Sequence, residues 1–309
     1  LSDFLIKFGA SVMKSVATTP DDFTRIVSTH LADTHFVFDR VRFMTCGEVV
    51  SLNWVPDRND IARMTALPQK LAKERAMPFL VVLKEFHNLM NADEYEDVFK
   101  IMEVQMRERD RSEQFQAVYV MTGAMVNAMK FIFEEKRFFY RQVNHVAFTP
   151  VDEKEIIEHI VKGFLNGMGK SFDRNLAMGA CELFKCNLWY MNHLAAICDA
   201  LSKGFVTENM MTDALNSMIS VHEPRFVSIV NDLTDHQLSL MKAVLDGVVK
   251  FSASDVIEKY HLNSSANVRR VKDALKKKEV ITFNEKDEPV VLDPLFEYWI
   301  RRYYFEMTE

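Results

Sequence analysis

The chain has 309 residues, of which 48% are hydrophobic and 27% charged, values that are ordinary for a globular protein and exclude extended disorder and fibrous repeats. With 9 glycines and 8 prolines, tight turns are scarce, so we expect a mostly helical chain of two or three domains. The net charge of −6 excludes a protein that is basic throughout, so any contact with nucleic acid must be local. No apolar run approaches the roughly 18 residues of a membrane span, and no signal peptide is apparent. We therefore expect a cytoplasmic protein without membrane contact.

The first 35 residues predict two helices. Leu1, Phe4, Leu5 and Phe8 follow helical spacing. Neither an initiator Met nor a capping residue precedes them, so we expect a further segment N-terminal to Leu1. The second helix should begin at the sequence Thr-Thr-Pro of residues 18–20, which supplies a cap and a proline for the first turn.

The next part of the chain alternates between helix and strand patterns. After an irregular stretch over residues 36–60, the predicted order is a helix with Pro68 at its start, then strand, helix, strand, helix and strand. These elements are Leu67–Arg75, Phe79–Leu83, Tyr95–Arg111, Phe115–Met121, Met125–Glu135 and Val143–Phe148, after which Thr149 and Pro150 should cap the next helix. Continuous apolar runs are typical of strands buried on both faces of a parallel sheet. Residues 1–150 are therefore predicted to form an α/β domain.

The C-terminal half predicts a run of helices followed by a segment that combines helices with a β-hairpin. Residues 151–225 predict a lid of about four amphipathic helices, interrupted at Glu223-Pro224. Residues 226–309 predict three helices and a β-hairpin, the order of a winged helix-turn-helix. The expected elements are Thr234–Leu245, Ser252–Tyr260 with Ser252 or Ser254 as cap, Ala266–Lys278 capped by Ser264 or Ser265, and the strands Val280–Phe283 and Val290–Leu292.

The four cysteines are Cys46, Cys181, Cys186 and Cys198. Cys181 and Cys186 would lie about 140° apart around a helix, so their side chains should diverge. This is not the spacing of a zinc finger. We interpret all four as buried or idle thiols in a reducing compartment, with disulfides or a metal site as the alternative.

Polar residues stand at the ends of two predicted strands. Lys84 and Glu85 follow the first, and Thr122 follows the second. In open α/β sheets, functional residues lie at the carboxyl ends of the strands, so we expect these residues to lie at one edge of the sheet. Arg141, which precedes the third strand, suits an arginine that neutralises phosphate charge. The alternative is that Lys84 and Glu85 solvate a strand end, Thr122 closes a turn and Arg141 lies on the surface.

Three segments together resemble the AAA/STAND-related P-loop ATP-binding proteins of bacteria and archaea: VVLKEFHNL, YVMTGAMVNAMKFIFEEKRFFYRQVNHVAFTP and LDPLFEYWIRRYYF. The resemblance runs from Phe79 to Phe305 and implies a P-loop core, a helical lid and a winged helix. It implies ATP and Mg²⁺ as cofactors, with Glu85 activating water, Thr122 sensing the γ-phosphate and Arg141 facing phosphate. Lys84 departs from the pattern, because it stands where an acid supports the metal. A second departure is Cys186-Asn187-Leu188, where related proteins often carry a Gly-x-Pro turn.

The phosphate-binding loop of that family is not found. The segment GFLNGMGKS over residues 163–171 resembles one, but the pattern G-x-x-x-x-G-K-[ST] needs a glycine where Phe164 stands. The segment also follows a predicted helix, whereas a phosphate loop is fed by a buried strand. We interpret it as a turn of the lid, and expect a true phosphate loop just before Leu1.

The third helix of the winged domain is locally basic. Residues 250–279 carry eight basic and four acidic side chains, a charge of +4 in a chain of −6. Val268, Val271 and Leu275 should form its buried stripe, which leaves a basic stripe exposed. The predicted DNA-contacting residues are Arg269, Arg270, Lys272 and Lys276. The alternative is a surface for protein contact or for packing on the ATPase core.

Two functional hypotheses follow from the sequence. The first is an ATP-binding protein, a slow ATPase that switches between nucleotide states. The second is a non-enzymatic DNA- or protein-binding module whose nucleotide fold has decayed. Glu85 and Arg141 favour the first hypothesis, and Lys84 favours the second.

Overall fold

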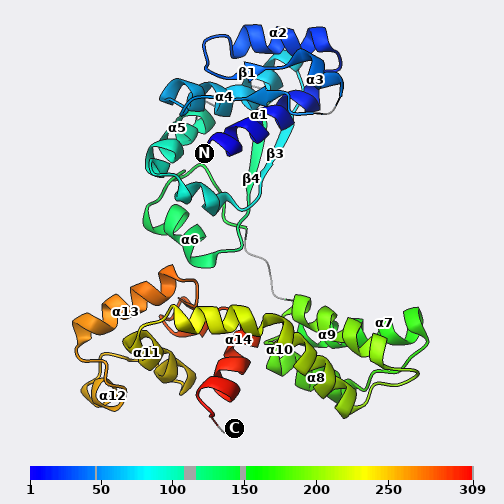
Figure 1. The fold of residues 1–309 in the computed structure, drawn as a ribbon, viewed down its shortest axis with the longest axis vertical. Coiled ribbons are helices and arrows are strands. Elements are labelled where there is room, and N and C mark those ends of the chain that lie inside the picture. The colour runs from blue at the N-terminus through cyan, green and yellow to red at the C-terminus, as the bar shows by residue number, and fades with distance from the viewer. Residues whose placement is uncertain (46, 108–115, 147–150, 308–309) are drawn as a thin grey trace. The chain divides into compact units, whose positions relative to one another are not determined.

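The computed structural model describes residues 1–45, 47–107, 116–146 and 151–307, which form two compact units, Leu1–His145 and Val146–Glu309 (Figure 1). Each unit has its own hydrophobic core. None of the helices in these ranges has the length and apolar character that a membrane span requires. The finer division into core, lid and winged helix at residues 150 and 225 stays a prediction.

The N-terminal unit combines helices with short strands (Figure 1). Its elements are α1 (Ser2–Val16), α2 (Pro20–His30), β1 (Val37–Phe38), α3 (Arg40–Met44), β2 (Val50–Ser51), α4 (Arg58–Arg75), β3 (Phe79–Leu83), the 3₁₀ helix η1 (Phe86–Asn91), α5 (Tyr95–Arg107), β4 (Ala117–Met121), α6 (Val126–Lys130) and the π-helical turn η2 (Phe131–Glu135). The predicted start of α2 is confirmed: the Thr19 side chain accepts a hydrogen bond from Asp22 N, and Pro20 occupies the first turn.

The helix before β3 begins earlier than predicted. It begins at Arg58, where Asp57 and Asp60 form a reciprocal capping box, and Pro68 lies inside it. The placement of Pro68 at a helix start was therefore wrong. Buried side chains on both sides of the proline, among them Met64 and Leu71, hold the helix in the core and offset the hydrogen bond that the proline removes.

Strands β3 and β4 pair in parallel, with Leu83 opposite Met121. The expectation that they are buried on both faces was wrong, since Leu80 and Val82 are 69% and 49% exposed. Phe79 and Val81, at the alternate positions, pack toward the core. Helix α4 contacts this pair, and its Gln69 accepts a hydrogen bond from Ala117 N at 2.9 Å.

The third predicted strand is not observed where the structure describes it. Residues 143–146 have no strand conformation, and residues 147–150, which include the predicted cap Thr149-Pro150, lie outside the described ranges. Within the described residues the parallel sheet therefore has two strands. Without a third strand the apolar residues Val143 and Val146 are exposed.

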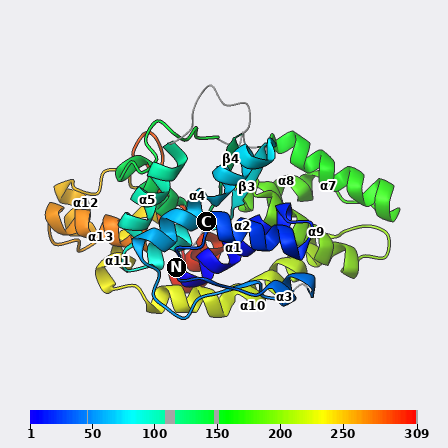
Figure 2. The same ribbon diagram turned by 90° about the horizontal axis from the view of Figure 1, so that it is seen from above.

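The C-terminal unit is helical with one hairpin. In both views α7 and α8 lie at one end of it and α12 and α13 at the other (Figures 1 and 2). Its elements are α7 (Glu153–Met168), α8 (Arg174–Leu183), α9 (Leu188–Leu201), α10 (Glu208–Asn231), α11 (Asp235–Leu245), α12 (Ser254–Lys259), α13 (Ser265–Lys277), β5 (Ile281–Phe283), β6 (Pro289–Val291), α14 (Pro294–Trp299) and the π-helical turn η3 (Ile300–Tyr304).

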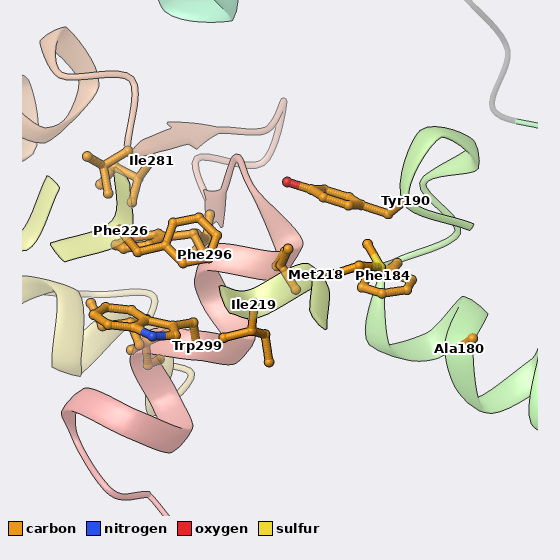
Figure 3. Packing of buried hydrophobic residues seen from close by; sticks show 14 of the residues in the cluster. Ala180, Phe184, Tyr190, Met218, Ile219, Phe226, Ile281, Phe296 and Trp299 are labelled. Carbon is orange, nitrogen blue, oxygen red and sulfur yellow. The ribbon is translucent and has the colours of Figure 1, made fainter. Parts of the chain in front are cut away.

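Four helices do follow residue 151, as predicted, but the expected break at Glu223-Pro224 was wrong. Helix α10 continues through Pro224 to Asn231. Buried side chains on both sides of the proline, Met218 and Phe226, hold the helix in the core and offset the lost hydrogen bond. Helices α7 to α10 and the elements after them thus share one core, in which Phe226 packs against Phe296 and Trp299 (Figure 3).

The winged-helix order is confirmed. Ser264 caps α13, and Val268, Val271 and Leu275 form its buried stripe as predicted. The capping residue of α12 was predicted wrongly: Ala253 occupies that position, without a side-chain hydrogen bond, so neither Ser252 nor Ser254 caps the helix.

The glycine-rich segment 163–171 was interpreted as a turn after a helix, but α7 continues to Met168, so only its last residues lie beyond the helix. Gly169 closes α7 at φ +64°, and the N–H of Lys170 donates to Phe164 O at 3.0 Å. A left-handed glycine with this bond is a common helix C-terminus. The side chain of Lys170 is engaged by Asp199 in a 2.5 Å ion pair.

The expectation that Cys181 and Cys186 diverge was wrong. Helix α8 ends at Leu183, and the chain then turns through left-handed residues, so that the two sulfur atoms lie 2.6 Å apart. Cys181, Cys186 and Cys198 are free thiols, while Cys46 lies outside the described residues.

Candidate nucleotide site and nucleic-acid interface

The ends of β3 and β4 bring the predicted site residues together. Beyond the strands, Thr122 N donates to Leu83 O at 2.9 Å, and Phe86 N donates to Thr122 O at 2.9 Å. These bonds extend the pairing of the strands and place Glu85 and Thr122 at the same edge. Both side chains are exposed there. Their assignment as catalytic residues stays a prediction.

Glu85 is one of twelve non-glycine residues in the described ranges that have a positive φ. It lies in the left-handed region, at φ 51° and ψ 44°, although it is not a glycine. Its side chain is 50% exposed, and its Oε2 accepts a hydrogen bond from Ala124 N at 3.3 Å. Non-glycine residues in this region cost of order 1–3 kcal/mol and are concentrated at functional sites.

His87 is buried, and its side chain lies next to that of Glu85. Its Nε2 lies 3.5 Å from Glu85 Oε2, and its Nδ1 is buried with no hydrogen-bond partner among the described residues. A Cβ on Gly123 would stand 2.7 Å from that Nδ1 and 2.6 Å from Met129 Sδ. A side chain at Gly123 would therefore force His87 or Met129 to shift, which the place of Gly123 after Thr122 did not indicate.

Lys84 is exposed at the end of β3, one residue before Glu85. Its position after the strand makes Lys84 the predicted cofactor-binding residue, and this stays a prediction. The strand end therefore offers one cation and one carboxylate, where two acids would give a site more attractive to a divalent cation.

Arg141 is not joined to the other two predicted catalytic residues by an ion pair within the described part of the chain. Its guanidinium lies 5.3 Å from the centre of the Tyr140 ring. The loop that carries it has left-handed residues at Arg137, Phe139 and Arg141. Phe139 anchors this loop, since its buried ring lies 5.9 Å from that of Phe86, the neighbour of Glu85.

A second polar cluster was missed from the sequence. His35, Asp57 and Asp60 place their ligand atoms within 4.8 Å of one another, and no metal is needed to explain it. Asp60 accepts hydrogen bonds from His35 N at 2.8 Å and Asp57 N at 3.0 Å. Burial opposes ionisation of Asp60, but these bonds outweigh it and lower its pKa. The cluster caps α4.

The basic side chains of α13 differ in their availability. Arg269 and Arg270 are exposed, whereas Lys276 is half-buried. Lys272 lies over the Phe283 ring at 4.1 Å from its centre and 3.6 Å from Asp287. The turn between β5 and β6 carries Glu285, Asp287 and Glu288 against the single cation Lys286, so the wing is acidic. The basic face is therefore narrower than the charge count indicated.

Comparison with known proteins gives two consistent results. Residues 224–302 match the family described as a probable winged helix domain. The chain resembles a Walker-type ATPase of Pyrococcus abyssi, with a TM-score of 0.59 and 15% identity over 90% of this chain and 75% of that one. The C-terminal segment thus has the winged-helix fold, and the whole chain has a fold like that of the archaeal ATPase.

Two structures of the Aeropyrum pernix ORC2 protein also match, at 13% identity and TM-scores of 0.47 and 0.46. They cover 78% and 87% of this chain and 66% and 74% of their own. These scores are too low to support an argument about fold. None of the curated proteins compared matches this chain.

Proposed function

We propose that the N-terminal unit binds ATP and hydrolyses it slowly, as a switch between nucleotide states. The observation that carries this proposal is the meeting of Glu85 and Thr122 at the carboxyl ends of two parallel strands. The ATPase-like fold supports it. The left-handed backbone of Glu85 adds a second argument, because strain persists where the surrounding structure enforces a functional geometry.

In this proposal the strand-end residues act on the attacking water and on the phosphate. The Glu85 carboxylate accepts a proton from the attacking water and orients it, as a general base does. The Thr122 hydroxyl donates a hydrogen bond to a γ-phosphate oxygen. Arg141, whose loop packs against Phe86 through Phe139, neutralises phosphate charge. His87 lies within 3.5 Å of Glu85 and holds that carboxylate in place.

The residues present fit Mg²⁺ only in part. Mg²⁺ is usually held by one or two carboxylates together with substrate phosphates, and Glu85 and Thr122 supply one carboxylate and one hydroxyl. When bound, the ion would neutralise phosphate charge. Lys84 beside it opposes a cation, and this is our reason for proposing slow rather than rapid hydrolysis.

Two substitutions test the proposal in the complete natural protein. Glu85→Gln should lower ATP turnover by roughly 10²-fold or more while a fluorescent ATP analogue still binds. Lys84→Asp should raise turnover, on the order of tenfold, by restoring an acid at the strand end. Glu94→Gln, which changes an exposed carboxylate elsewhere in the unit, is the matched control. Absence of turnover in every variant, with no binding of the analogue, would contradict an ATPase.

A second candidate function, a binding module with a degenerate nucleotide site, is favoured by Lys84 and by the exposed arginines of α13. For this case we propose that Arg269 and Arg270 contact DNA phosphates, with Lys276 at the edge of the contact. Each phosphate contact contributes about 0.9 to the slope of log K against log salt concentration. Replacing both arginines by alanine should flatten that slope by about 1.8.

The matched control for this experiment is Lys272→Met. Because Asp287 and the Phe283 ring already engage the ammonium group, its loss should leave the slope almost unchanged. Duplex DNA titrated at several salt concentrations gives the slopes. An unchanged slope in the arginine variant, or no binding by the wild type at low salt, would assign this face to a protein contact.

A further inference from the structure

The turn between α8 and α9 brings two thiols closer than a non-bonded contact. Lys185 and Cys186 adopt left-handed backbone conformations, at φ 50° and 55°, and Cys186 N donates to Cys181 O at 2.7 Å. The two Sγ atoms consequently lie 2.6 Å apart. Heavy atoms that are not bonded rest at about 3.5–4.0 Å, so the separation lies well inside contact distance. The turn thus holds the sulfurs within reach of a covalent bond.

The two thiols differ in access to solvent. Cys181 is fully buried in the core of the C-terminal unit, whereas Cys186 is half-buried at its margin. Burial, together with the hydrogen bond to Cys186, raises the pKa of Cys181 to about 12. The other buried thiol of this unit, Cys198, has its pKa raised to about 11 by burial. A reagent in solution therefore meets Cys186 first, because thiol reactivity follows exposure and thiolate content.

We propose that Cys181 and Cys186 form a reversible disulfide by exchange with a small-molecule disulfide such as oxidised glutathione. The Cys186 thiolate attacks one glutathione sulfur, forms a mixed disulfide and releases the other glutathione as its thiolate. Cys181 then gives its proton to water and attacks Cys186 Sγ, which releases the second glutathione. The protein loses two thiol hydrogens and two electrons, and one oxidised glutathione becomes two reduced ones.

The two cysteines flank a residue that contacts another helix of the C-terminal unit. Lys185, which lies between the two cysteines along the chain, pairs through Nζ with Glu297 of α14 at 2.5 Å. The turn therefore connects the helices α8 and α9 to the helix that closes the winged domain. A covalent bond from Cys181 to Cys186 would fix the backbone that presents Lys185. The redox state of the pair thus acts on the contact between this turn and α14.

The experiment uses the 309-residue protein, first reduced and then equilibrated with an excess of oxidised glutathione. Free thiols are blocked with N-ethylmaleimide, and the protein is digested with trypsin without reduction. Because trypsin cleaves after Lys185, a disulfide between Cys181 and Cys186 joins two peptides that are otherwise separate. We expect the joined pair, with its mass lower by two hydrogens than the sum of the peptides, and its separation after reduction.

Two variants identify the partner. The second peptide contains both Cys186 and Cys198, so Cys198→Ser should retain the joined peptides and Cys186→Ser should lose them. Retention in Cys186→Ser, or loss in Cys198→Ser, would overturn the proposal. So would complete blocking of both thiols in the wild type, or a glutathione adduct on Cys186 that Cys181 never displaces.

Discussion

The left-handed backbone of Glu85 leads to a stability prediction with an unusual sign. In the left-handed region a Cβ approaches the following carbonyl oxygen, which costs roughly 1–2 kcal/mol, and glycine avoids this cost. Glycine also gains freedom in the unfolded chain, which offsets about 0.5–1 kcal/mol of the relief. Glu85→Gly should therefore be neutral or stabilise the N-terminal unit by up to about 1 kcal/mol.

Glu85→Ala is the comparison that isolates the strain. Both variants lose the 3.3 Å hydrogen bond from Ala124 N, but alanine keeps the Cβ and its conflict. The glycine variant should accordingly be the more stable of the two by about 1 kcal/mol, whereas inside a helix or strand it would be the less stable. Both should lose ATP turnover, since both lack the carboxylate.

Hydrogen exchange in urea measures the two variants in the N-terminal unit alone. Peptides that cover β4 report on its opening, and a change of 1 kcal/mol moves a urea midpoint by about 0.3–1 M. If the glycine variant proves equal to or less stable than the alanine variant, the backbone of Glu85 stores no strain. The structural argument for a functional role of its conformation would then fail.

Two further predictions concern the surroundings of the site. Asp60 has a lowered pKa in the folded state. Its contribution to the stability of the fold is therefore complete above its pKa in the unfolded chain, and it is lost as the pH falls through its pKa in the folded protein. Asp60→Asn should lower the free energy of unfolding by about 1–2 kcal/mol at pH 7 and by progressively less toward pH 3. Urea midpoints of the wild type and the variant across that pH range would test this. If the difference between the two midpoints does not change with pH, the loss comes from the shape of the side chain and not from its charge. Gly123→Ala should destabilise by about 1–3 kcal/mol, because its Cβ would meet the buried His87 ring and Met129. Met129→Ala in the same protein should recover part of that loss in the urea midpoint, and full independence of the two changes would contradict the packing argument.

Local signals predicted much of the fold. The start of α2 at Thr19-Pro20 and the cap of α13 at Ser264 depend on hydrogen bonds within a few residues, so they can be predicted from short segments. The same holds for the winged helix, whose buried stripe follows from helical spacing. The two prolines inside α4 and α10 could not be placed this way, because packing of distant residues decides whether a helix tolerates them.

The candidate site was predictable only in outline. Adjacent parallel strands end at one edge, so the meeting of Glu85 and Thr122 followed from their positions after two apolar runs. The left-handed conformation of Glu85 and the close packing of His87 against Gly123 are tertiary features that the order of residues along the chain does not indicate. The closeness of Cys181 and Cys186 depends on where α8 ends, which a helical projection through Cys186 cannot indicate.

The acidic wing changes what the charge of the winged helix can achieve. A charge of +4 over residues 250–279 suggests a strong phosphate surface, but Lys272 is engaged by Phe283 and Asp287. Arg269 and Arg270 are the exposed arginines of α13 and would supply two phosphate contacts. With two contacts, raising the salt concentration from 50 to 200 mM would lower the affinity for DNA only about tenfold. Proteins with six to ten contacts lose roughly 10³–10⁵ over that range. Binding to DNA through these two arginines alone would therefore be weak, and a function that depends on it requires further contacts.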